Sequence, residues 1–355
     1  MSDLEKLFID LVTIDSPSGE EREMSQYLLK WLHEVGFKTT IDDTGNIYAF
    51  TEKEPKLFIC SHMDTVEPGR NIKPILKDGI FVSDGTTILG ADNKAAVAAI
   101  ISAVNSYKDI NGQPPSIEIV FSVREETGGG IEFFPFKWLK SKRGYIFDSA
   151  KPLGHIILAA PYIYNFHAKF IGKPSHSSRP EEGCNSLLPA IKFISNVKVG
   201  RFDNGETTIN IGKVHSGSGI NIIPEETIVD GEVRSTNHKK FLSHLEEIES
   251  LAKKTIEGSN VEIKYHTDGY CPGYKWDKDS ELIKSIVHIL KNEVSEITYD
   301  QSTGVSDANS FNGFGFEVVN LSDGVSDPHT KKESIKSEDL KKLSEIILHI
   351  LKDFS

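Results

Sequence analysis

The sequence predicts an α/β protein that carries a second, α+β domain inserted into it. In the first part of the chain, helical patterns alternate with short apolar runs, which is typical of a sheet covered by helices. Residues 162–266 differ, because longer half-exposed strands are interleaved there with two helices. The first pattern then resumes. We therefore expect a discontinuous domain of residues 1–160 and 273–355, and an inserted domain of residues 161–272.

The N-terminal elements are the most clearly marked. Ser2 and Glu5 form the pattern of a capping box before a first helix. A second helix is expected at residues 20–35, with Gly36 at its C-terminal end. Residues 57–60 are apolar on both faces, which favours a buried strand. Other strands of this domain are expected at residues 37–41, 47–51, 117–123, 145–147 and 317–321, and other helices at 93–107, 280–292 and from 337 onwards.

The inserted domain has its own order of elements. Alternation of apolar and polar residues predicts strands at 162–171, 207–214, 226–234 and 261–266. Helices are expected at 185–196 and 238–256. Together they predict a compact antiparallel sheet with helices on one face.

Composition excludes several kinds of partner. The net charge of -12 is unfavourable for nucleic-acid binding, which needs a concentrated basic surface. The acidic N-terminus is neither a signal nor a transit peptide, and the longest apolar run is too short to span a bilayer. Three widely spaced cysteines fit a reducing compartment better than a disulfide framework. We therefore expect a cytoplasmic protein that binds neither nucleic acid nor membrane.

The first candidate site residues are His62 and Asp64, directly after the strand at residues 57–60. In open α/β sheets, ligands bind beyond the carboxyl ends of the strands. A histidine there can hold a metal ion while the aspartate orients its imidazole. The alternative is an ordinary histidine that is hydrogen-bonded at a strand end.

Further acidic residues follow other predicted strands or open a helix. Asp92 stands at the start of a helix, where it could also be a simple N-cap. Glu125 and Glu126 follow the strand at 117–123 and precede three glycines. They could be surface residues, or they could divide the roles of ligand and general base.

Asp148 and His329 complete the set, so that five successive strand ends are expected to carry acidic residues or histidine. Two carboxylates about 4 Å apart repel by roughly 4 kcal/mol at an effective dielectric constant of 20. Such a cluster needs protons or cations. Two histidines among carboxylates favour zinc, with manganese or cobalt as alternatives, and the number of ligands suits two ions.

Four motifs in this order resemble the aminoacylase/carboxypeptidase-like zinc metallopeptidases: SHMDTV, GTTILGADNKAA, REETGG and DPHT. The peptidase T-like branch is the most similar, and the resemblance covers essentially the whole chain. It implies a zinc-exopeptidase-like three-layer domain with a mixed sheet, and a ferredoxin-like insert acting as a lid or in dimerisation. It further implies these roles: His62 and Asp148 bind one zinc, Glu126 and His329 the other, Asp92 bridges them, Asp64 supports His62, and Glu125 is the general acid/base.

The resemblance also assigns substrate-binding residues to the insert. The segment GKPSHSSRPEEGCNS is similar to one that holds a substrate-contacting histidine, here His176, which in family dimers can reach the partner's site. The segment INIGKVHSGSGINIIPEETIVDGEVRS is similar to one that contributes Asn221 and Arg234. Taken alone, Asn221 could be a turn residue and Arg234 a surface charge.

A few positions depart from the family pattern or allow two interpretations. Asn93 stands where a second aspartate is common, after a peptide bond that is cis in relatives, and Ser178 and Thr303 stand where glycine is common. The motif TGVSDANSF resembles a family segment near the site, but Asp307 and Asn309 could equally cap the next helix.

The expected function is hydrolysis of amide bonds in small peptides, with tripeptide-type aminopeptidase activity favoured by the resemblance. The alternatives are an N-acyl-amino-acid deacylase or carboxypeptidase of the same family, and a metal- or peptide-binding protein without turnover. The expected partners are a small peptide substrate and a second copy of the chain, bound through the insert.

Overall fold

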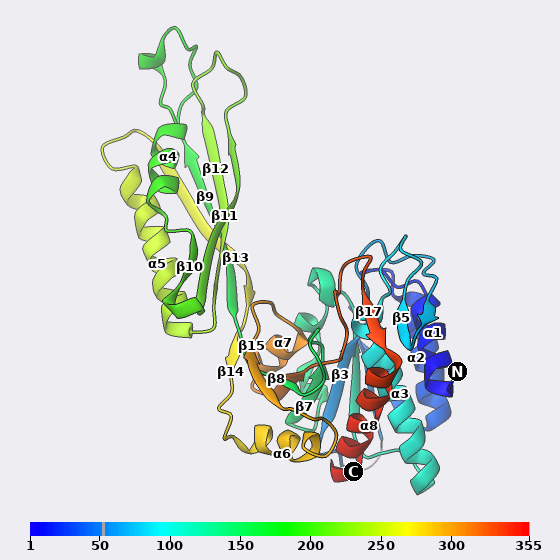
Figure 1. Cartoon of the computed structure of the whole chain (residues 1–355). Coiled ribbons are helices and arrows are strands. Elements are labelled where there is room, and N and C mark those ends of the chain that lie inside the picture. Colours follow the sequence, from blue (N-terminus) through cyan, green and yellow to red (C-terminus); the bar gives the residue numbers. More distant parts are fainter. Residues whose placement is uncertain (52–53, 355) are drawn as a thin grey trace. The chain divides into compact units, whose positions relative to one another are not determined.

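The computed structural model describes residues 1–51 and 54–354 and is traced in Figure 1. The polypeptide forms two compact units. Unit 1 consists of Met1–Leu158, Trp276–Ser302 and Ser306–Ser355, and unit 2 of Ala159–Lys275 and Thr303–Val305. Within the described part of the chain, no helix combines the length and apolar character needed to cross a bilayer.

Unit 1 is built on a mixed sheet whose central strands are parallel. The strands follow one another in the order β1 (Lys38–Ile41), β2 (Ile47–Phe50), β6 (Glu118–Ser122), β3 (Phe58–His62), β7 (Arg143–Phe147), β16 (Glu317–Leu321) and β8 (His155–Ala160), and β15 (Thr298–Gln301) pairs with β8. β6, β3, β7 and β16 run parallel to one another. Their carboxyl ends therefore meet at one edge of the sheet.

Both faces of this sheet are covered, which explains why its central strands are apolar throughout. Ile59 and Phe121 point into a core shared with the helices of one face. These helices are α1 (Asp3–Thr13), α2 (Arg22–Val35), α3 (Ala91–Asn111), α6 (Glu281–Leu290) and α8 (Ser337–Phe354). On the other face, Phe58 packs against Phe311 of α7 (Asp307–Gly313), with 4.8 Å between ring centroids and 37° between ring planes. The unit thus has three layers.

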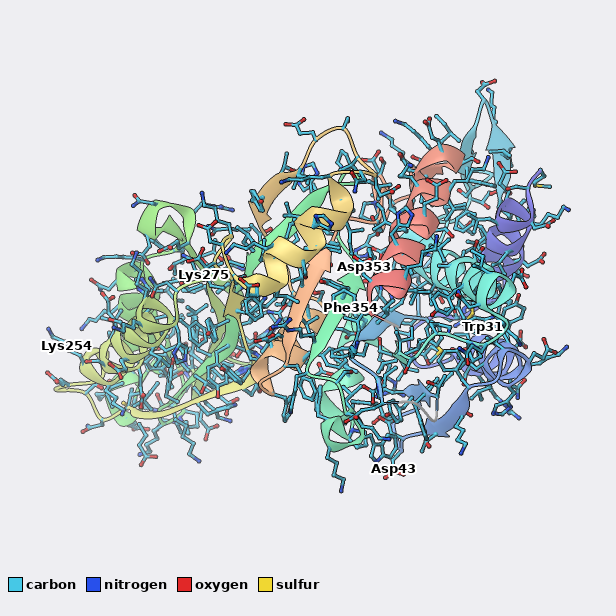
Figure 2. All side chains as sticks on the ribbon, turned by 90° about the horizontal axis from the view of Figure 1, so that it is seen from below. Trp31, Asp43, Lys254, Lys275, Asp353 and Phe354 are labelled. Atoms are coloured by element: carbon cyan, nitrogen blue, oxygen red, sulfur yellow. The ribbon has the colours of Figure 1, made fainter. Side chains whose placement is uncertain are left out.

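Polar and aromatic contacts fix the helices against each other and against the sheet. Ser2 caps α1 in a capping box with Glu5, and Gly36 ends α2 in the left-handed conformation, as predicted. Trp31 of α2 donates a hydrogen bond of 3.0 Å to Asn105 of α3. Figure 2 labels Trp31, and it labels Phe354 at the end of α8.

Three short strands form a separate small sheet that the sequence analysis did not predict. They are β4 (Ile75–Lys77), β5 (Ile80–Val82) and β17 (Ser334–Lys336). Each has three residues, which is too short for an alternating pattern to stand out. This sheet brings the segment before α8 next to the segment before α3.

Unit 2 contains a five-stranded antiparallel sheet. Its order is β10 (Gly200–Phe202), β11 (Thr207–Ser216), β12 (Glu226–Ser235), β9 (Tyr162–Ile171) and β13 (Glu262–Cys271). The helices α4 (Leu187–Asn196) and α5 (His238–Thr255) pack on one face of it, as Figure 1 shows. Phe166, Ala168 and Phe170 of β9 point into the core beneath them. β14 (Tyr274–Lys275) pairs with the last residues of β8.

The predicted fold class is confirmed, because a helix-covered mixed sheet and an α+β insert are both present. The predicted limits of the two domains stay a prediction. Besides the small sheet, β8, β10, β14 and β15 were not predicted.

Candidate active site

The carboxyl ends of the parallel strands carry most of the predicted site residues. His62 is the last residue of β3, Asp148 directly follows β7, and the two glutamates lie in a short turn, η1 (Glu125–Thr127), after β6. His329 lies in the segment after β16. The structure therefore brings these residues to one edge of the sheet.

The expectation that a strand end also carries Asp92 is wrong. The preceding strand, β5, belongs to the small sheet, and Asp92 is supplied by the first turn of α3. Gly90 occupies the N-cap position of α3, and Asp92 itself has a non-helical backbone, with φ of -78° and ψ of 106°. The Asp92–Asn93 peptide bond is cis, as the family resemblance implied.

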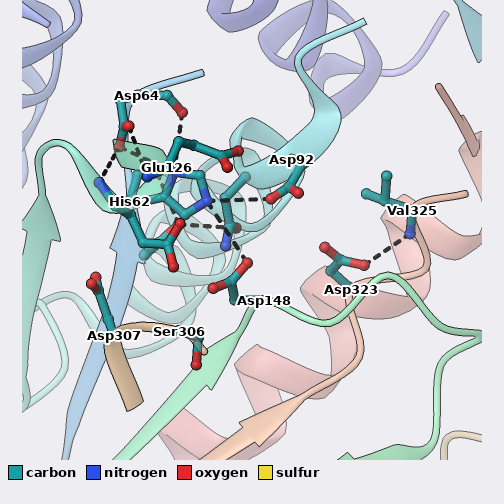
Figure 3. Close-up of polar contacts among 12 residues, drawn as sticks. His62, Asp64, Asp92, Glu126, Asp148, Ser306, Asp307, Asp323 and Val325 are labelled. Carbon is teal, nitrogen blue, oxygen red and sulfur yellow. Dashed lines mark hydrogen bonds and ion pairs between the residues drawn. The ribbon is translucent and has the colours of Figure 1, made fainter. Parts of the chain in front are cut away.

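His62 stands at the centre of the site and is buried. Its Nδ1 lies 3.0 Å from the backbone oxygen of Asp64 and 3.3 Å from the carboxylate of the same residue. Its Nε2 lies 3.2 Å from Asp92 and 3.7 Å from Asp148 (Figure 3). If Nδ1 donates to Asp64, the Nε2 lone pair faces two carboxylates, and this arrangement requires a proton or a metal cation between them.

Asp64 fixes the loop that bears the two glutamates. One carboxylate oxygen accepts the backbone N–H of Glu125 at 3.0 Å. The other accepts the N–H of Glu126 at 3.2 Å and the hydroxyl of Ser18 at 2.6 Å. Asp64 thus orients His62 and the loop of the glutamates at the same time.

His329 approaches the site from the opposite side of Asp92. Its Nε2 lies 2.9 Å from Glu126 and 3.3 Å from Asp92. The residue has a φ of 60°, a conformation that non-glycine residues adopt rarely and often at functional sites. Asp92 therefore faces His62 with one carboxylate oxygen and His329 with the other.

The side chains form three groups with metal-ligand spacing. His62, Asp92 and Asp148 make the first group, Asp92, Glu126 and His329 the second, and His62, Glu125 and Glu126 the third. In each group, one ligand atom from every residue lies within 4.8 Å of the others. Asp92 is common to the first two groups. The donors are imidazole nitrogens and carboxylate oxygens, a set that fits zinc and related divalent ions.

The pKa values of the protein groups, taken without metal ions, show that negative charges are crowded at the site. Burial raises the pKa of Glu125 well above its ordinary value, and the Asp148 carboxylate raises it further. Burial also raises the pKa of Asp148. Burial lowers the pKa of His62, but hydrogen bonds to Asp148, Asp64 and Asp92 outweigh it, so that the net shift is strongly upward. Hydrogen bonds to Asp92 and Glu126 raise the pKa of His329 to about 10.

Asp92 shows the opposite shift. Burial raises the pKa of this carboxyl, but hydrogen bonds from His329 and His62 overcome that effect and hold it below its ordinary value. Asp92 is therefore the group of the cluster that stays ionised most readily. This suits a carboxylate shared between two cations.

The sequence analysis missed Glu333. Its buried carboxylate accepts the backbone N–H groups of Leu89 and Gly90, both at 2.8 Å, and of Asp92 at 2.9 Å. It thereby holds the loop that presents Asp92. In the sequence it stands in the polar run KKESIK, which gives no signal of burial.

Two more buried carboxyls border the site in Figure 3. Ser306 and Asn309 form the capping box of α7, whereas the Asp307 side chain accepts a hydrogen bond from Ser122 at the end of β6. Burial raises the pKa of Asp307 to about 7. Asp323 was not singled out in the sequence; burial raises its pKa well above the ordinary value, and Asp92 raises it further.

The three residues predicted in the insert all lie in unit 2, but at two separate positions. His176 and Asn221 are neighbours, because Ser177 donates its backbone N–H to the backbone oxygen of Asn221 at 2.9 Å. Arg234 lies near the far end of β12, where it contacts Glu232 and the backbone oxygen of Thr303. Asn221 precedes β12, so the length of this ten-residue strand separates it from Arg234.

Comparisons with known proteins agree with this architecture. A family model described as the peptidase dimerisation domain of M20 peptidases matches residues 161–259. The protein YqjE of Bacillus subtilis strain 168, which is described as uncharacterized, is 32% identical over 98% of this chain and 96% of its own length.

Two solved structures are similar over nearly the full length. Aminopeptidase PepT from Bacillus cereus ATCC 10987 has a TM-score of 0.91 and 32% identity, with 99% of this chain and 97% of that chain covered. A tripeptidase from Staphylococcus aureus subsp. aureus Mu50 has a TM-score of 0.90 and 32% identity, with the same coverage of 99% and 97%. Fold, site geometry and relatives thus agree, and the chain belongs to the peptidase T-like branch of the M20 metallopeptidases.

Proposed function

We propose that this protein is a two-zinc aminopeptidase that removes the N-terminal residue from tripeptides. The observation that supports this most directly is the pair of ligand groups that share Asp92, with Glu125 beside them. The similar proteins described as an aminopeptidase and a tripeptidase support the choice of substrate.

In this proposal His62 and Asp148 hold one ion, Glu126 and His329 hold the other, and Asp92 lies between them. Zinc suits the nitrogen and oxygen donors, while manganese or cobalt could replace it. When bound, two such ions lower the pKa of a shared water and polarise the scissile carbonyl.

Glu125 is the group that moves the proton. Its carboxylate takes a proton from the attacking water and then donates it to the departing amine. Its backbone N–H is fixed by Asp64, so that the carboxyl is held beside the ligands. Among the protein groups alone, burial and the Asp148 carboxylate raise the pKa of Glu125.

A panel of substrates tests this function. Zinc-loaded protein is incubated with free tripeptides, N-blocked tripeptides and N-acetyl amino acids, and the released amino acids are identified by chromatography. We expect the N-terminal residue of free tripeptides to be released. Cleavage of only the blocked or acetylated compounds would instead support the carboxypeptidase or deacylase alternative. No turnover by metal-loaded protein would support a binding protein.

The insert supports a proposal about assembly, because it matches a peptidase dimerisation domain. His176 and Asn221 adjoin each other, but the length of β12 separates them from Arg234. All three can contact one small peptide only if they come from different chains. We therefore propose a homodimer in which His176 of one subunit completes the site of the other and stabilises the oxyanion.

Mixing of two inactive variants tests this arrangement. His176→Ala and Glu125→Gln chains, each inactive alone, are expected to regain activity when coexpressed, because a mixed dimer contains one complete site. Random pairing makes half of the dimers mixed, so the recovery should be roughly a quarter of the wild-type rate. Sedimentation gives the oligomeric state. A dimer without recovery would place His176 in the site of its own subunit.

A further inference from the structure

Unit 2 carries another group of side chains with metal-ligand spacing, on the face of its sheet that α4 and α5 leave uncovered. The side chains of Phe166 and Ala168 point into the core of this unit. Because side chains alternate along a strand, His167 of β9 points to the opposite face. His266 of the edge strand β13 lies directly across from it.

The geometry of β13 directs two ligands towards His167. The imidazoles of His167 and His266 stack with 4.6 Å between centroids and 16° between planes. Asp268 lies two residues further on the same face and precedes a β-bulge, where Gly269 has a φ of 63°. Such bulges redirect side chains. The Asp268 carboxylate lies 3.1 Å from Nε2 of His167.

Asp230 holds His167 from the other side. It lies across from His167 on β12, and its carboxylate is 2.9 Å from Nδ1 of His167. If Nδ1 donates to Asp230, the Nε2 lone pair faces the Asp268 oxygen, and two acceptors at that distance require a proton or a cation. A carboxylate that orients a histidine from behind is a common feature of zinc sites.

We propose that His167, His266 and Asp268 bind a divalent transition metal ion such as Zn²⁺, with Asp230 orienting His167. One ligand atom of each of the three residues lies within 4.8 Å of the others. Tetrahedral zinc with bonds of about 2.1 Å places ligand atoms roughly 3.4 Å apart. To share an ion with His167, the His266 ring has to turn out of its stacked orientation, which its exposed position allows. Water fills the fourth position.

Charges of both signs surround the cluster. Asp230 and Asp268 supply two carboxylates, and the ammonium group of Lys169 is paired with Glu226 at 2.5 Å. Lys213 lies across from Asp230 and Lys264 across from Lys169, so the case for an ion rests on the ligand geometry. A bound ion would link the edge strand β13 to β9 through side chains, in addition to their backbone ladder. We therefore assign this site a structural role within unit 2.

Metal counting tests the site in the full-length protein. Wild-type protein and variants are equilibrated with excess Zn²⁺, passed through a desalting column and measured for bound zinc. His266→Ala is expected to bind one zinc fewer per chain than wild type. His215→Ala removes an exposed histidine on β11, which β12 separates from β9, and is the matched control. Asp230→Asn should weaken this ion by about 10- to 100-fold.

Cobalt gives a second measurement, since Co²⁺ with nitrogen ligands absorbs visible light. When the spectrum of His266→Ala is subtracted from that of wild type, the difference should show the absorption of one such ion. Equal zinc content and no cobalt difference would overturn the proposal and leave an ordinary network of ion pairs. Because the experiment measures a difference of one ion, its outcome does not depend on whether the site of unit 1 binds two ions.

Discussion

Glu125→Gln is expected to lower the turnover number by about 10²- to 10⁴-fold while both metal ions stay bound. Glutamine has nearly the same shape as glutamate but cannot accept the proton of the attacking water. In the proposed arrangement Glu125 is not a ligand, and its backbone hydrogen bond to Asp64 does not depend on the side chain. The measurements are steady-state kinetics with a tripeptide and metal content by atomic absorption.

The comparison with Glu126→Gln separates the roles of the adjacent glutamates. Glu126 lies 2.9 Å from His329 in a ligand group, so its substitution should release one ion as well as activity. Glu338→Gln, at an exposed position of α8, is the control. A Glu125→Gln enzyme with a rate within tenfold of wild type would remove Glu125 from catalysis, and loss of metal would make it a ligand.

The fold was predictable where the pattern of apolar residues along the chain marks the buried face or faces of a helix or strand. The run at residues 57–60 is apolar because both faces of the sheet are covered, and β3 lies there. In contrast, β4, β5 and β17 have only three residues each, and β15 pairs at the margin of the sheet. Their formation depends on partners distant in the sequence, which a local pattern does not contain.

The site was predictable for a related reason. Residues that directly follow parallel strands must meet at one edge, so the positions of His62 and Asp148 follow from the strands themselves. Glu333 could not be found in this way, because tertiary contacts alone place its carboxylate against three backbone N–H groups. The cluster around His167 was missed as well, since it requires the register of β9, β12 and β13.

Asp92→Asn is expected to weaken both metal ions, whereas His329→Ala should remove only one. The two oxygens of Asp92 face His62 and His329, and no other residue belongs to both of these ligand groups in the described chain. Asparagine retains one ligand oxygen but lacks the charge. A charge pair 4 Å apart contributes about 4 kcal/mol at an effective dielectric constant of 20, so the affinity of each ion should fall by about a thousandfold.

Two measurements distinguish the loss of both ions from the loss of one. They are metal analysis after dialysis and melting curves. Metal ions that bind only the folded state raise its melting temperature, and Asp92→Asn should lose most of this rise. Asp43→Asn, in an exposed turn labelled in Figure 2, should keep it. If Asp92→Asn retains one tightly bound ion, as expected of His329→Ala, then Asp92 serves a single ion. In that case the two ligand groups do not act as one bridged centre, because the shared carboxylate is what couples them.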